Sequence, residues 1–147
     1  MNKLILLILS LVMLGCKTAN IPKETTMEKL QKYKWKAVMN ESSKDVICEV
    51  YQKDLMECRM FIEKGEFYCT VPFYLSDSID THFDKKKVGK NKNGKYIVED
   101  MGGPMSVDKI LELNDSVMII QKYPDYPIRT YIAEPKTAKF LKDEKLK

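Results

Sequence analysis

The chain has 147 residues, of which 44% are hydrophobic and 31% are charged, and its formal net charge is +4. This length fits a single domain, and the balance of apolar and charged residues excludes a disordered or collagen-like chain. The positive excess is small. It therefore predicts no nucleic-acid partner, because proteins of that class are usually far more basic.

Residues 1–15 have the layout of a secretory signal peptide. Lys3 supplies a positive charge, residues 4–14 are apolar apart from Ser10, and the small residue Gly15 follows. The apolar run is shorter than the roughly 20 residues that a transmembrane helix needs. We therefore expect this segment to be an export signal that is removed from the mature protein.

The end of this segment, Met13-Leu14-Gly15-Cys16, resembles a bacterial lipobox, in which the cysteine is acylated and becomes the mature N-terminus. The resemblance implies a chain attached to a lipid bilayer through Cys16, with residues 16–25 as a lipidated tether. Two or three acyl chains anchor durably, whereas one alone binds only marginally. Lys17, where an aspartate often signals inner-membrane retention, favours the outer membrane of a cell envelope. The alternative is an ordinary signal peptide followed by a chance cysteine.

A short helix is predicted next. Thr25 and Glu28 have the spacing of a capping box, in which each side chain bonds the backbone N–H of the other. The helix should continue to about Lys34 with Met27 and Leu30 facing inward. It opens a domain expected over residues 26–134, and residues 135–147 read as a polar, Lys-rich tail.

From Trp35 onward the apolar residues recur with a period of two, which is typical of half-buried strands. The inward-facing phases are expected to hold Trp35, Ala37 and Met39; Val46, Cys48 and Val50; Met56, Cys58, Met60 and Ile62; and Phe67, Cys69, Val71, Phe73 and Leu75. Further strands are expected over 85–91, 95–99, 109–113, 117–121 and 128–133. The first of these is an edge strand, and it turns at Asn93-Gly94, a strong hairpin signal.

About eight or nine short strands joined by hairpins predict an all-β fold. The favoured architecture is an antiparallel up-and-down β-barrel of about eight strands with a short N-terminal helix. A barrel of this size is filled by side chains or holds one small ligand.

Several segments carry a resemblance to the lipocalin-like domain of small bacterial lipoproteins: Tyr33-Lys34-Trp35, residues 60–68, residues 93–97, residues 111–117 and Arg129-Thr130-Tyr131. The resemblance implies a lipocalin-like barrel in which a late arginine stacks on the tryptophan of the first strand. We therefore expect Trp35 and Arg129 to be neighbours that close the barrel, since a guanidinium lies well on a ring face. The alternative is an arginine that faces solvent.

Three cysteines, Cys48, Cys58 and Cys69, remain in the body of the chain. An exported protein meets an oxidising compartment, and a hairpin centred near Lys53 would bring Cys48 opposite Cys58, within disulfide range. The favoured arrangement is a Cys48–Cys58 bridge. Another pairing, or three buried thiols, remain open alternatives.

Other polar residues indicate no catalytic or metal chemistry. The segment with Asp77, Asp80, His82 and Asp84 reads as a solvated acidic loop, since its ligand types and spacing suit neither calcium nor zinc. We expect no enzyme activity and no cofactor. The lysines between 85 and 95 fit an exposed sheet edge, or else docking to lipid phosphates. Tyr123 and Tyr126, on a Pro-stiffened loop, are the candidate rim of a binding site.

These patterns together favour an envelope lipoprotein that binds a small apolar ligand or an envelope protein. The alternative is an inhibitor or immunity-type lipoprotein that acts through protein–protein contact and holds no internal ligand. A cavity of about 300 Å³ or more would favour the ligand binder over the inhibitor.

Overall fold

The computed structural model describes residues 23–136. The expected signal peptide, Cys16 and residues 137–147 of the tail lie outside the described residues. Within the described part, no helix has the length and apolar character needed to cross a bilayer.

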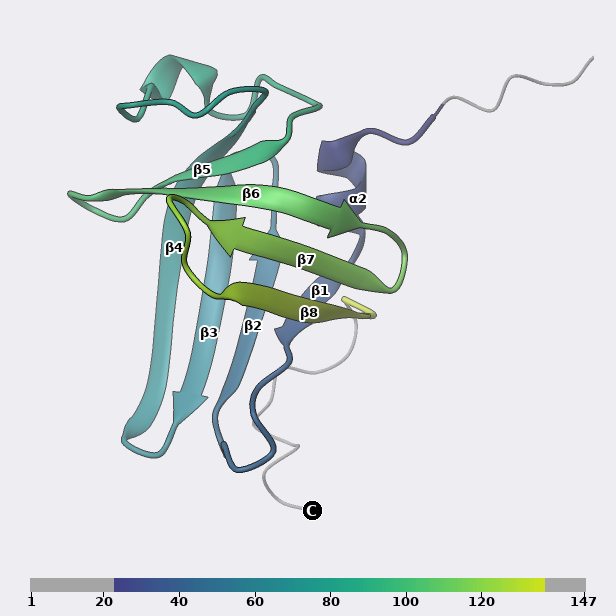
Figure 1. Cartoon of the computed structure of the whole chain (residues 1–147), viewed down its shortest axis with the longest axis vertical. Coiled ribbons are helices and arrows are strands. Elements are labelled where there is room, and N and C mark those ends of the chain that lie inside the picture. The colour runs from purple at the N-terminus through teal and green to yellow at the C-terminus, as the bar shows by residue number, and fades with distance from the viewer. Residues whose placement is uncertain (1–22, 137–147) are drawn as a thin grey trace, which may run out of the picture.

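Eight antiparallel strands pair in chain order, and the last pairs with the first to close a barrel (Figure 1). The expected up-and-down barrel with a short N-terminal helix is thus confirmed. The strands are β1 (Lys34–Ala37), β2 (Val46–Tyr51), β3 (Leu55–Ile62), β4 (Gly65–Ser76), β5 (Tyr96–Asp100), β6 (Met105–Leu113), β7 (Val117–Lys122) and β8 (Ile128–Glu134).

Helix α2 (Thr26–Lys32) precedes β1 and covers one end of the barrel. The predicted capping box is present: the Thr25 N–H donates to the Glu28 carboxylate at 2.7 Å, and the Glu28 N–H donates to the Thr25 hydroxyl at 3.2 Å. The helix buries Met27 and Leu30 in the core. The Trp35 indole N–H donates to the Leu30 carbonyl oxygen at 2.9 Å, which fixes the helix against the first strand.

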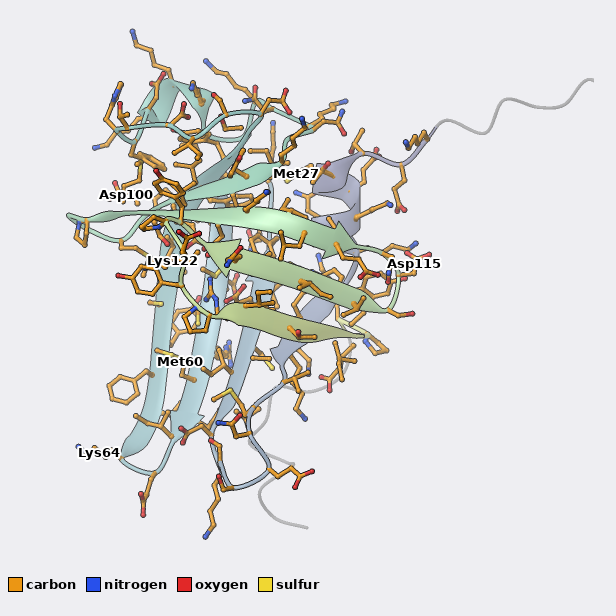
Figure 2. The ribbon with its side chains drawn as sticks, viewed as in Figure 1. Met27, Met60, Lys64, Asp100, Asp115 and Lys122 are labelled. Carbon is orange, nitrogen blue, oxygen red and sulfur yellow. The ribbon has the colours of Figure 1, made fainter. Side chains whose placement is uncertain are left out.

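The strands form two layers that cross at a steep angle, with β1–β4 running down the view and β5–β8 across it (Figure 1). The long hairpin of β3 and β4 extends beyond the crossing strands, with its turn at residues 63–64. Figure 2 labels Lys64, Met60, Asp100 and Lys122 along one side of the molecule and Asp115 on the other. The end of the barrel away from α2 is therefore bounded by the hairpin and by the loops after β5 and β7.

Two predictions for the segment before β5 are wrong. Residues 85–91 form no strand; a short 3₁₀ helix, η1 (Lys85–Lys87), lies there instead, capped by the Asp84 side chain. β4 pairs directly with β5, so the closed barrel leaves no sheet edge at this point for an added strand. Asn93-Gly94 is likewise no hairpin turn, because Gly94 packs on β4 so closely that a Cβ would lie 2.7 Å from the Ser76 nitrogen.

Candidate functional site

A cavity of about 400 Å³ opens into the barrel at the end away from α2; we call it the barrel cavity. Strand ends and adjoining loops from both layers contribute to its wall. Most of that wall is apolar or sulfur-bearing: Ala37, Val38, Met39, Ile47, Met56, Cys58, Met60, Cys69, Val71, Met101 and Ile128. The remaining lining residues are Glu49, Glu99, Arg129 and Tyr131. An apolar wall with a few converging polar groups is typical of small-molecule sites.

A polar cluster lies inside the barrel beside this cavity. It consists of the side chains Glu49, Glu99, Asp108 and Arg129, which come from β2, β5, β6 and β8. The three acids are less than one-tenth exposed. Burying so many ionisable groups is costly unless each finds a partner, so the partner of each group indicates how the cluster is held.

Glu49 has two donors. The Tyr131 hydroxyl donates to one carboxyl oxygen at 2.7 Å, and the Tyr51 hydroxyl donates to the other at 2.8 Å. Burial raises the pKa of Glu49 and outweighs these hydrogen bonds, which favour the charged form. Both tyrosines have raised pKa values for the same reason, burial first and the nearby acid second.

Asp108 and Arg129 form an ion pair. The Arg129 Nη2 lies 2.7 Å from the Asp108 Oδ1, and the aspartate side chain is 2% exposed while that of the arginine is 43% exposed. The guanidinium also lies over the Tyr131 ring, with 6.0 Å from Cζ to the ring centroid. Arg129 is thus held between Asp108 and Tyr131 where β8 lines the barrel cavity.

Glu99 differs from its neighbours. Its carboxyl lines the barrel cavity and is 7% exposed, and within residues 23–136 it has no hydrogen bond or ion pair. Burial, followed by the charges of Glu49 and Asp108, raises the pKa of Glu99 to about 8. An acid with such a pKa changes its protonation in the neutral range, a feature that clusters at functional sites.

The expected contact between Trp35 and Arg129 is wrong. Trp35 pairs with Ala133, four residues along β8 from Arg129, which is roughly 13 Å of strand. Trp35 packs at the end covered by α2, where it forms a T-shaped pair with the Tyr33 ring at 5.6 Å between centroids. Arg129 lies at the open end because Asp108, a buried carboxylate, is its partner there.

The expected Cys48–Cys58 bridge is also wrong, and the three cysteines within the described part of the chain are free thiols. The register pairs Cys48 with Arg59 and Glu49 with Cys58. Since neighbouring residues of a strand point to opposite faces, Cys48 lies on the outer face and Cys58 on the inner one. The residue opposite Cys58 in the sheet is Cys69, on β4, and both line the barrel cavity.

Tyr123 and Tyr126 are half-exposed on the loop between β7 and β8. They do not line the barrel cavity. Tyr123 instead borders a separate hollow of about 300 Å³ together with Pro124 and Lys109. The next two residues of the chain that do line the cavity are Ile128 and Arg129, so a rim role for these tyrosines remains a prediction.

Glu49, Glu99 and Asp108 were not predicted as interior residues, because the apolar phase of each strand was expected to face inward. That phase is right for β1, β3 and β4, but β2 presents Ile47, Glu49 and Tyr51 to the interior. Both faces of β2 carry apolar residues, so the alternation in its sequence does not indicate which face is turned to the interior. A carboxylate within each of three strands of one barrel was the signal that could have found the cluster.

A second hollow of about 450 Å³ lies outside the barrel beside α2. Its lining is largely polar or charged, with Lys23, Thr26, Lys29 and Asn93 among the residues. The buried acids and apolar wall belong to the barrel cavity instead, and we take that cavity as the candidate site. Comparison of the chain with models of protein families, with curated proteins and with solved structures gave no match.

Proposed function

We propose that this protein is a membrane-anchored envelope lipoprotein whose barrel binds a small, largely apolar ligand. The observation that carries the binding role is the barrel cavity, whose volume of about 400 Å³ lies within the range of small-molecule sites, ~300–1,000 Å³. Its sulfur-bearing wall offers flexible, polarisable contacts that adapt to an apolar body. The anchoring part rests on the lipobox-like Met13-Leu14-Gly15-Cys16.

The role we propose is binding without catalysis. The barrel cavity is open at one end and covered by α2 at the other, so a ligand enters beside the β3–β4 hairpin and stops at the core around Trp35 and Phe73. Acylation of Cys16 would hold this open barrel close to a bilayer, where apolar molecules are concentrated.

Native mass spectrometry of protein purified from its own envelope tests the binding role. We expect an added mass of one organic molecule on the wild type. Cys69→Trp, which fills the barrel cavity from β4, should lose it. Thr70→Trp places the same ring on the opposite face of β4, where Thr70 is exposed, and should retain it. An added mass that survives Cys69→Trp, or none on the wild type, overturns the proposal.

A second candidate, an interaction protein of the inhibitor or immunity type, is favoured by the β3–β4 hairpin. It extends beyond the crossing strands β5–β8 and exposes Phe67 and Tyr68, 49% and 55% accessible, on its two faces. Exposed aromatic side chains of this kind are enriched at protein interfaces. Site-specific photocrosslinking from position 68 in the envelope should capture one protein if this function is correct, and only lipid or solvent if it is not.

A further inference from the structure

Of the three acids inside the barrel, one receives no hydrogen bond from the described part of the protein. Glu49 is bonded by two tyrosine hydroxyls, and Asp108 is paired with Arg129. Glu99 has neither kind of partner among the described residues, although its side chain is more than nine-tenths buried and lines the barrel cavity. The Glu99 oxygens open onto the cavity and are not fully enclosed by protein, so a group placed in the cavity can supply the donor that the surrounding strands do not.

The charges around Glu99 specify the sign of that group. Three acids, Glu49, Glu99 and Asp108, lie near two cationic side chains. Those cations, Arg129 and Lys122, both favour the charged form of Glu99. Arg129 is bonded to Asp108, and Lys122 lies over the Tyr126 ring, with 5.7 Å from its nitrogen to the centroid. An anionic ligand would add a further negative charge beside the acids, whereas a cation would balance the excess.

The wall of the cavity specifies the rest of the ligand. Beyond Glu99, the surfaces contributed by Met56, Met60, Val71 and Met101 offer no charge and only the weak acceptor of a thioether. They suit an alkyl chain or an apolar ring rather than a second polar group. The site thus combines one acid that has no protein partner among the described residues, Glu99, with a largely apolar wall.

We propose that the barrel cavity takes an amphiphile bearing a protonated amine, whose nitrogen donates to the Glu99 carboxylate while its apolar body packs on the methionine-lined wall. This inference rests on the proposed ligand-binding function and names the class of ligand. It makes Glu99 a binding residue, and an anionic competitor would meet the acids Glu49 and Asp108 beside it.

Proton linkage gives this inference its own signature. Glu99 must be ionised to hold the amine, so binding below a pH of about 8 releases a proton and weakens as the pH falls. Titratable or charged groups face Glu99 from the strands packed around it. They are Tyr51 and Glu49 on β2, Cys58 on β3, Cys69 on β4, Asp108 on β6, Lys122 on β7, and Arg129 and Tyr131 on β8.

The test compares three probes with one chain length, decylamine, decanol and decanoate, on the full chain. Binding is followed by the ¹³C-methyl signals of methionine. Met56, Met60 and Met101 line the barrel cavity, whereas Met27 and Met105 lie elsewhere and serve as internal references. We expect decylamine to bind most tightly at pH 8.5 and to weaken by about tenfold per unit below pH 8, while decanol binding stays level.

Glu99→Gln should reduce decylamine affinity by about tenfold to a hundredfold at pH 8.5, the range for a hydrogen bond to a charged group, and leave decanol unaffected. Glu66→Gln removes an equal charge from the exposed hairpin and should change neither. If decanol or decanoate binds as well as decylamine, or if decylamine binding is independent of pH, the amine inference fails while the ligand-binding function stands. If no probe shifts the cavity methionines, the ligand-binding function itself fails. The pH profile of the wild type decides the matter even if Glu99→Gln does not fold.

Discussion

The Tyr131 hydroxyl on β8 donates a 2.7 Å hydrogen bond to the Glu49 carboxyl on β2. The two strands are not neighbours, because β1 lies between them and pairs with both. β1 has only four residues, and Tyr131 stands opposite its last residue, Ala37. The hydrogen bond therefore ties β8 to β2 where the intervening strand ends, beside the barrel cavity.

Removing this hydroxyl should weaken the closure of the barrel. Tyr131→Phe leaves one oxygen of the buried Glu49 without a donor, and we expect the free energy of unfolding at pH 7 to fall by about 1–3 kcal/mol. Urea denaturation measures the change. Tyr126→Phe, which removes a hydroxyl from a half-exposed ring, is the control and should cost less than about 0.5 kcal/mol. Equal losses from the two variants would contradict the role assigned to Tyr131.

The raised pKa of Glu99 predicts how stability changes with pH. Between the pKa of an unfolded glutamate, about 4.3, and the folded value of about 8, the native state holds a proton that the unfolded chain has lost. The free energy of unfolding should therefore fall as the pH rises from 5 to 8, by at most about 1.4 kcal/mol per unit. Glu99→Gln should flatten this slope, and Glu66→Gln should not. Thermal melts across the range measure it, and parallel slopes for wild type and Glu99→Gln would sink the prediction.

The ion pair of Asp108 and Arg129 predicts a coupled effect. Arg129→Gln leaves Asp108 buried without a cation, and we expect the free energy of unfolding to fall by about 1–3 kcal/mol. This is no more than the smallest cost usual for breaking a fully buried ion pair, because the arginine side chain is partly exposed. Asp108→Asn in the same chain should recover part of the loss. A double-mutant cycle by urea denaturation measures the coupling, and losses that simply add would show that the pair is not an energetic unit.

The barrel itself was accessible from sequence because hairpin connections and period-two patterns are local signals. The residues assigned to the correct face on this basis include Trp35, Met56, Cys58, Met60, Cys69, Val71, Phe73 and Leu75. The partner of Arg129 was not accessible, since an arginine in a strand reveals only that some acid or ring is needed. Its partner, Asp108, is 21 residues away in sequence and was not recognised as interior.

In the loop over residues 77–95, a strong local turn signal led to a wrong prediction because contacts with distant segments determine the conformation there. Asn93-Gly94 favours a hairpin turn, but the Asn93 side chain instead accepts a hydrogen bond from the Thr26 N–H at 3.1 Å, and Gly94 lies against β4. Both contacts are with segments distant in the chain, so no local pattern could reveal them.

The three thiols should differ in reactivity, which provides a direct check on the orientation of β2 and β3. Cys69 is exposed, Cys48 is fully buried, and burial raises the pKa of Cys58 to about 12. Because the thiolate is the reactive form, iodoacetamide at pH 8 should label Cys69 first in the folded protein and all three after unfolding. Peptide mass mapping gives the order. Early labelling of Cys48 would mean that the outer face of β2 is open and that the observed register is wrong.

The lipid anchor makes a prediction that does not depend on the barrel. Each buried CH₂ contributes ~0.8 kcal/mol, so two or three acyl chains on Cys16 hold the protein at a bilayer where the short apolar segment 4–14 alone would not. Cys16→Ser should move the protein from the membrane pellet to the soluble fraction, and palmitate labelling should disappear with it. Cys48→Ser, which removes another thiol from the body of the chain, should leave both unchanged. The lysines of η1 could add only electrostatic attraction, which high salt screens. A Cys16→Ser protein that stays in the pellet after a high-salt wash would therefore rule out acylation as the anchor.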